Sequence, residues 1–220
     1  AQSLALNFTN EGGVCGTIRL LKNVNGLWLI QECRRQWAAE GQPLSYSEIS
    51  SSAAAAPAFG PIIDPDLDCF TTPGRIAAMV LEHANAHGAQ LPDAVGSIAR
   101  CIFESLAMKY RYTLDILEKA VGYTVDRLHI VGGGSNNDLL NQLTADYTGK
   151  TIIAGPEEAT AIGNICTQML GMGALKSLAE ARDVVRRSCR TRIFEPRTTP
   201  AHESHYQRFL AEAALPLPPK

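Results

Sequence analysis

The residues best placed to do chemistry form a glycine turn after a short apolar run. Residues 128–131 read LHIV, and Gly132–Gly134 follow them directly. A similar arrangement recurs where Gly155 and Pro156 follow the run TIIA. Because glycine has no Cβ, such a turn can adopt φ > 0 and let a flat or anionic ligand contact the backbone. A helix starting just after the turn would add unpaired N–H groups and a partial positive charge. The run alone leaves two alternatives open, a ligand-binding turn and a turn that needs glycine only to be tight.

A dinucleotide-binding turn is the first alternative to consider. That turn has the pattern G-x-G-x-x-G and an acid about twenty residues further on. Gly132 and Gly134 fit the pattern, but Asn137 stands at the third glycine position. The acids that follow the next apolar run, Glu157 and Glu158, lie at an expected helix start, where the helix dipole favours acids in any case. The pattern therefore argues against dinucleotide binding.

Other reactive side chains form no recognisable site. The sequence has no G-x-S-x-G pattern, and its six cysteines show no C-x-x-C spacing, so reduced thiols are expected. His202 and His205 are three residues apart without a third metal ligand nearby. The acids Asp64, Asp66 and Asp68 cluster in an irregular segment, where we interpret them as turn formers. Spacing alone therefore assigns no side chain of this chain to catalysis or to metal binding.

Composition narrows the class of protein. The chain has 220 residues, of which 45% are hydrophobic and 19% are charged, as in ordinary soluble globular proteins. A formal net charge of −2 gives no reason to expect nucleic acid as a partner. No apolar run is long enough to span a bilayer, and no signal peptide is evident, so we expect no membrane partner and a cytoplasmic location.

Hydrophobic periodicity predicts the elements that position the turn. Strands and helices alternate in the second half, so we predict an α/β fold with a mixed or parallel sheet. Asn23 is the expected N-cap of a helix that places Leu27 and Trp28 in the core. Residues 41–74 are expected to be irregular, with room for one helix near SYSEISSSAAAA. The other expected elements are strands over residues 17–21, 128–131 and 151–154, and helices over residues 73–87, 93–121, 137–148, 157–170, 177–190 and 200–213.

The segment LHIVGGGSNNDLLNQLTADYTGKTIIAGPEEATAIGN closely resembles the C-terminal domain of the FGGY carbohydrate kinases, members of the actin-like ATPase superfamily. Within that family, NFTNEGGVCGTIRLLKNVNGLWLIQECRRQW and RCIFESLAMKYR are most similar to the kinases of L-rhamnulose. The resemblance runs from about Asn7 to Glu195 and implies an RNase H-like domain, a mixed sheet flanked by helices. It therefore divides the chain into a kinase domain over residues 1–195 and a C-terminal helix with a frayed tail over residues 196–220.

The same resemblance implies a reaction and its site. The family uses ATP and Mg²⁺ to phosphorylate a ketose at its terminal hydroxyl, which for L-rhamnulose gives L-rhamnulose 1-phosphate. Asn23 of LKN would contact the sugar, and Gln31 of GLWLIQ and Gly133 of VGGG would contact ATP. On one helix Asn23 and Gln31 would lie about 12 Å apart along the axis, which suits a cleft with sugar and nucleotide at opposite ends. The other nucleotide-site residues that the resemblance implies are Gly132, Gly134, Ser135 and Asn136.

The family resemblance also implies that part of the machinery lies elsewhere. The catalytic aspartate, the phosphate-binding loop and most sugar contacts of the family belong upstream of Ala1, so we expect a missing N-terminal kinase domain as partner. An exposed interdomain face would then favour self-association of the isolated chain. Two alternatives remain: a kinase of another ketose, and a non-catalytic module of this fold that binds a nucleotide or a protein.

Overall fold

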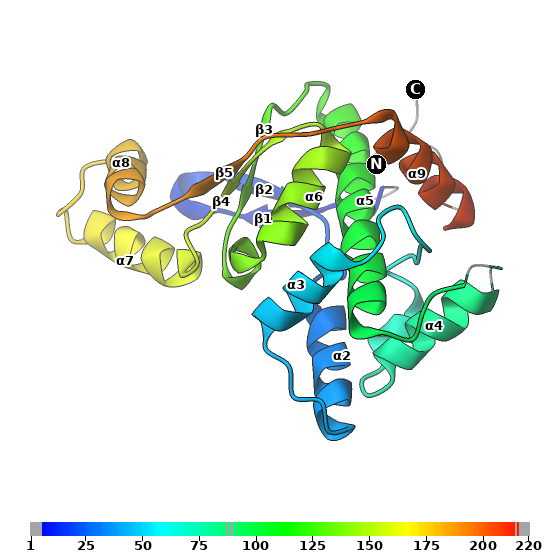
Figure 1. Cartoon of the computed structure of the whole chain (residues 1–220). Helices are drawn as coiled ribbons and strands as arrows, with labels where there is room; N and C mark the ends of the chain where they lie inside the picture. Colours follow the sequence, from blue (N-terminus) through cyan, green and yellow to red (C-terminus); the bar gives the residue numbers. More distant parts are fainter. Residues whose placement is uncertain (1–5, 87, 89, 214, 216–220) are drawn as a thin grey trace.

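The computed structural model describes residues 6–86, 88, 90–213 and 215 (Figure 1). The strands are β1 (Thr9–Gly12), β2 (Ile18–Leu21), β3 (Arg127–Ile130), β4 (Thr151–Ala154) and β5 (Arg192–Phe194). The α-helices are α2 (Trp28–Ala39), α3 (Tyr46–Ala55), α4 (Ile76–Ala86), α5 (Val95–Val121), α6 (Asp138–Thr148), α7 (Ala159–Gly171), α8 (Leu178–Ser188) and α9 (Pro200–Glu212). Short 3₁₀ turns are η1 (Val14–Gly16), η2 (Asp68–Thr71) and η3 (Gly133–Asn136). The expected helix end at His87 and most of the expected frayed tail lie outside the described residues.

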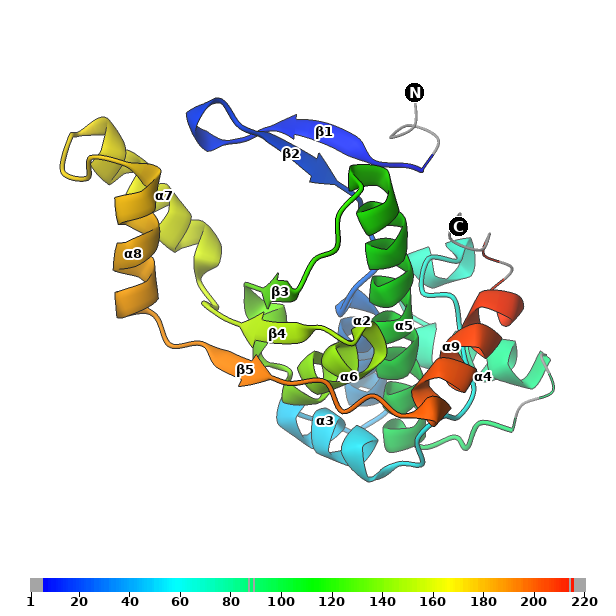
Figure 2. The same cartoon turned by 90° about the horizontal axis from the view of Figure 1, so that it is seen from above.

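The strands form two separate sheets. β1 and β2 make an antiparallel hairpin, and the second sheet has the order β3-β4-β5. β3 is parallel to β4, whereas β5 is antiparallel to it, so the predicted α/β fold with a mixed sheet is confirmed. Figure 2 shows the hairpin apart from the three-stranded sheet, with the long helix α5 beside both.

Helix α5 is the centre of the hydrophobic core. The expected helix over residues 93–121 is confirmed, and Ile98, Ile102 and Leu106 are buried on it. Helices α3 and α6 pack against it. At Gly96 a Cβ atom would lie only 2.5 Å from the carbonyl oxygen of Ser52, so glycine lets α3 pack closely on α5. Helix α5 ends at Val121, as expected, and Gly122 is its left-handed C-cap.

The irregular segment after α3 is tied to α5. The Phe59 N–H donates to the Glu104 carboxylate at 3.1 Å, and the Ile63 N–H donates to Ser105 Oγ at 3.1 Å. Ile63 is buried, and Glu104 also accepts from Arg100. Fixed backbone groups of this kind make a long connection part of the core rather than a free loop.

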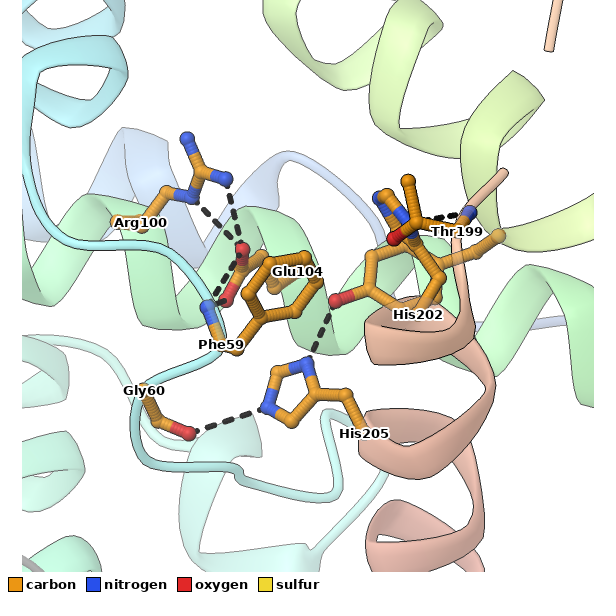
Figure 3. A network of polar contacts seen from close by, with 8 residues as sticks. Phe59, Gly60, Arg100, Glu104, Thr199, His202 and His205 are labelled. Atoms are coloured by element: carbon orange, nitrogen blue, oxygen red, sulfur yellow. Dashed lines mark hydrogen bonds and ion pairs between the residues drawn. The ribbon is translucent and has the colours of Figure 1, made fainter. Parts of the chain in front are cut away.

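Helix α9 is anchored to the same segment by two histidines (Figure 3). His205 Nε2 lies 3.1 Å from the Gly60 carbonyl oxygen, which can only accept, so Nδ1 is the acceptor for the Tyr147 hydroxyl at 2.6 Å. The Phe59 ring contacts His202 and His205 edge-on. Both histidines are buried in this packing. The division at residue 195 stays a prediction, and α9 packs on the same core as the helices before it.

Candidate functional site

The two glycine turns lie together at one edge of the sheet. The Gly132 N–H donates to the Pro156 carbonyl oxygen at 3.0 Å, and the Gly155 N–H donates to the Ile130 carbonyl oxygen at 2.8 Å. Because β3 and β4 are parallel, their carboxyl ends meet at this edge. In open α/β sheets, ligands bind outside the carboxyl ends of the strands.

Two of the glycines shape this edge. Gly132 has φ 78° and Gly155 has φ 112°, a region that residues with a Cβ atom rarely adopt. At Gly155 a Cβ atom would also lie 2.9 Å from the Arg190 carbonyl oxygen. The turn continues through η3 into α6, whose cap is the Asn137 side chain, which accepts from the Leu140 N–H at 3.0 Å. The predicted helix after the glycine run is therefore confirmed.

Gly133 leaves open space in front of the turn. It is exposed, and a Cβ atom built on it would meet no atom within 4 Å. By contrast, a Cβ atom at Gly134 would be 3.7 Å from Leu27. A ligand can therefore approach the backbone at Gly133, while Gly134 faces the start of α2.

A cavity of about 920 Å³ lies in front of Gly133, between α2, α3 and the start of α6. The structure brings four of the seven predicted site residues to its wall: Gln31, Gly133, Gly134 and Asn136. Gln31 is exposed on α2, whose neighbouring residues Leu29 and Ile30 are buried. Because these buried neighbours fix α2 in the core, the helix holds the Gln31 side chain at the cavity wall.

A serine-rich face of α3 forms the opposite wall, which the sequence reasoning missed. Ser47, Ser50 and Ser51 share one helical face and line the cavity. The helix begins in a capping box in which Ser45 Oγ accepts from the Glu48 N–H at 3.2 Å and the Glu48 carboxylate accepts from the Ser45 N–H at 2.7 Å. The S-x-x-E pattern could have predicted this start.

The expected helix from Asn23 is wrong. α2 begins at Trp28 with Leu27 as N-cap and without a side-chain cap, and Asn23 lies in the loop before it. The Asn25 N–H donates to Asp66 and its side-chain amide donates to the Pro65 carbonyl oxygen, so this part of the chain is tied to a distant segment and not to a helix turn. Asn23 and Gln31 therefore do not share a helix, and Asn23 is not in the cavity wall. Leu27 and Trp28 pack against the core, as expected.

Ser135 lies beneath the turn rather than in the cavity wall. It is 2% exposed, and its hydroxyl donates to the Gly132 carbonyl oxygen at 2.7 Å. The Ser135 carbonyl oxygen accepts from Asn141 Nδ2 at 2.8 Å. Ser135 and Gly132 thus hold the shape of the turn that presents Gly133.

Two kinds of feature are absent from the part of the chain that the structure describes. Among the described residues, no three His, Cys, Asp or Glu side chains converge in a way that could hold a metal ion. No helix in the described part of the chain combines the length and apolar character needed to cross a membrane.

The fold is shared with solved structures of sugar kinases. The crystal structure of xylulose kinase from Rhodospirillum rubrum matches with a TM-score of 0.64 at 18% identity, covering 94% of this chain and 41% of that one. Plasmodium falciparum glycerol kinase with ADP matches with a TM-score of 0.63 at 17% identity, covering 93% of this chain and 43% of that one. At such identities the likeness shows the fold alone.

Sequence comparison defines the family. The family model for the C-terminal domain of the FGGY family of carbohydrate kinases matches residues 1–172. The chain belongs to this family, as the resemblance of its motifs predicted.

Within this family, two rhamnulokinases are similar to nearly the whole of this chain. A rhamnulokinase of Bacteroides thetaiotaomicron is 43% identical over 209 residues, which cover 95% of this chain and 42% of that protein. A rhamnulokinase of Enterococcus faecalis is 38% identical over 218 residues, which cover 98% of this chain and 44% of that protein. The chain thus spans about two fifths of the length of these relatives.

Proposed function

We propose that this chain is the nucleotide-side domain of an ATP-dependent sugar kinase that converts L-rhamnulose to L-rhamnulose 1-phosphate. The observation that carries the proposal is the convergence of Gln31, Gly133 and Asn136 on one cavity at the carboxyl ends of β3 and β4. The sugar is suggested by the names of the relatives, which act as whole proteins more than twice as long.

The cavity suits the nucleoside part of ATP. Its volume of about 920 Å³ falls within the usual range of ligand pockets, roughly 300–1,000 Å³. The amides of Gln31 and Asn136 can each donate and accept hydrogen bonds, as a base or a ribose requires. Asp138 and Glu157 also line the cavity. Asp138 is paired with Arg192, whereas Glu157 has no ion-pair partner among the described residues, so its carboxylate would repel phosphate groups. We therefore place the base and ribose here, with the phosphates directed away from Glu157.

Phosphoryl transfer needs more than this chain provides. Mg²⁺ neutralises charge on the transferred phosphate in such reactions. The described residues form no cluster of metal ligands, so we assign none to this chain. We assign the base that accepts the sugar proton, and the loop that holds the phosphates, to the part of the kinase that the relatives have and this chain does not cover.

Two other functions compete with this one. A non-catalytic module of the same fold would bind nucleotide without needing Asn23, whose amide is exposed and suited to sugar hydroxyls. A kinase of a different ketose would use the same nucleotide site with another sugar.

A kinase assay on the whole protein that carries this chain tests the proposal. We expect ATP-dependent phosphorylation of L-rhamnulose with a kcat/KM above that for other ketoses. Asn23→Ala should raise the KM for the sugar and leave the KM for ATP within about twofold, since it removes one hydrogen-bonding group. ATP binding without phosphorylation of any ketose would favour the non-catalytic module, and faster turnover of another ketose would change the assigned sugar.

A further inference from the structure

Lys109 of α5 forms an ion cluster with Asp64 and Asp66, and Asp66 contacts the loop of residues 22–26, which carries Asn23. We propose that Asp66 is a positioning residue that fixes this loop, so that Asn23 presents its amide to the sugar. The proposal rests on the sugar contact assigned to Asn23 above.

Asp66 binds the loop directly. Its Oδ1 accepts from the Asn25 N–H at 2.8 Å, and the neighbouring Pro65 carbonyl oxygen accepts from Asn25 Nδ2 at 2.8 Å. Two residues earlier, Asn23 is exposed, and its side chain makes no hydrogen bond within the described part of the chain. The loop is therefore held at Asn25 while the amide of Asn23 stays available to a ligand.

Asp66 is in turn held by α5. Its other oxygen, Oδ2, lies 3.1 Å from Lys109 Nζ, and Lys109 also lies 2.8 Å from Asp64 Oδ1. Lys109 is 4% exposed, and a buried ammonium group is costly unless carboxylates surround it. The Asp66 N–H donates to Asp64 Oδ1 at 3.1 Å, which fixes the turn between the two acids. Asp66 thus joins α5 to the loop, because one of its carboxylate oxygens contacts Lys109 and the other contacts Asn25.

Contacts at both ends of the loop limit its movement further. Lys22 Nζ donates to the Leu6 carbonyl oxygen at 2.9 Å, and burial, followed by the charge of Lys109, lowers the pKa of Lys22. Gly26 lies against Tyr110 of α5, whose hydroxyl would be 3.8 Å from a Cβ atom at Gly26. Asn23 is therefore an exposed side chain between the anchored residues Lys22 and Asn25.

Different contacts hold the loop that carries Asn23 and the helix that carries Gln31. Gln31 is carried by α2, which is held by its own buried residues Leu29 and Ile30 and does not contact Asp66 through a hydrogen bond or ion pair in the described residues. Loss of the Asp66 link should loosen the loop and raise the entropy lost on sugar binding, because ordering a backbone segment is costly. The nucleotide cavity should keep its geometry.

Two variants and a matched control test the role of Asp66. Asp66→Ala removes the contacts of Asp66 with the Asn25 N–H and with Lys109. Asn25→Ala removes the side-chain hydrogen bond to Pro65 and leaves the ion pairs of Lys109 in place. Asp68→Ala is the control, because Asp68 is an exposed acid in the same segment and its carboxylate contacts neither Asn25 nor Lys109.

Hydrogen exchange on this chain and kinetics on the whole kinase give independent results. Peptides covering residues 22–26 should exchange faster in Asp66→Ala and Asn25→Ala than in Asp68→Ala, with α2 unchanged. In the whole kinase, Asp66→Ala should raise the KM for L-rhamnulose about tenfold, the effect of roughly one hydrogen bond, with the KM for ATP within twofold.

Each contrary result has a distinct meaning. Unchanged exchange of residues 22–26 in Asp66→Ala would overturn the positioning role. An active whole kinase with an unchanged sugar KM in Asp66→Ala would overturn the link to the sugar alone. A parent kinase that phosphorylates no ketose would overturn the proposed function together with the inference that rests on it.

Discussion

The Gly132 N–H donates to the Pro156 carbonyl oxygen at 3.0 Å, which joins the turn after β3 to the turn after β4. The reciprocal bond from the Gly155 N–H to Ile130 completes a two-way link between the turns. Gly133 follows Gly132 in this turn and faces open space. The backbone that would contact the nucleotide is therefore held in place by the two hydrogen bonds between the turns.

Gly155 should tolerate no side chain. Gly155→Ala would place a Cβ atom 2.9 Å from the Arg190 carbonyl oxygen at a φ of 112°. We expect a loss of about 2–4 kcal/mol in the free energy of unfolding, measured by urea denaturation. Gly163→Ala is the control, since its Cβ atom meets nothing within 4 Å and should stabilise α7 by up to about 1 kcal/mol. Equal stability of Gly155→Ala and the parent chain would contradict the close approach.

Lys109 should be essential to the stability of the core. Lys109→Met removes the cation between Asp64 and Asp66 and leaves two carboxylates facing each other. Breaking a buried pair from one side costs about 3–5 kcal/mol, and we expect a loss of that size in urea denaturation. Lys176→Met, at an exposed position, should change the free energy of unfolding by less than about 0.5 kcal/mol. A Lys109→Met chain as stable as the control would show that the cluster contributes little.

Stability should fall in mild acid because of His205. Burial lowers the pKa of His205 from 6.5 to about 4. As the pH falls, the unfolded chain therefore protonates His205 before the folded chain does. The contribution of the neutral His205 side chain to stability is complete above pH 6.5 and is lost as the pH falls toward 4. The loss should approach about 3 kcal/mol. Because carboxylates titrate in the same range, the measurement is the difference in unfolding free energy between the parent and His205→Gln at each pH. A difference that does not change with pH would contradict the prediction.

The isolated chain should self-associate. Ile18 is 75% exposed on the β1–β2 hairpin, and Val131 is 52% exposed and lines an open apolar groove between β3 and α5. Exposed apolar surface of this kind favours association. Sedimentation velocity should show a weight-average mass that rises with concentration, and less so for Ile18→Ser. A strictly monomeric chain at high concentration would argue against an exposed interdomain face.

Local patterns predicted the elements that carry strong signals of their own. The helices over residues 93–121 and 137–148 are confirmed, because hydrophobic periodicity and the left-handed caps Gly122 and Gly149 act within a few residues. β1 was not predicted, since its sequence TNEG has no apolar alternation and the strand forms by pairing with β2.

Tertiary contacts explain the remaining differences. The loop before α2 is held by Asn25 and Asp66, which are 41 residues apart, and no local pattern reveals such a bond. The family motifs named Gln31 and Gly133, but only the fold shows that both line one cavity with the serines of α3. Residue spacing alone does not show which distant segments of the chain line the same cavity.

The most direct test of the nucleotide site is calorimetric titration of ADP with Mg²⁺ into this chain and two glycine variants. Gly133→Val places a side chain in the open space before the turn, whereas Gly12→Val adds one at an exposed position in β1, also without a neighbour within 4 Å. We predict binding by the parent chain and by Gly12→Val, and its loss in Gly133→Val. Equal binding by Gly133→Val and the parent, or no binding by the parent, would contradict the assignment of the nucleotide to this cavity.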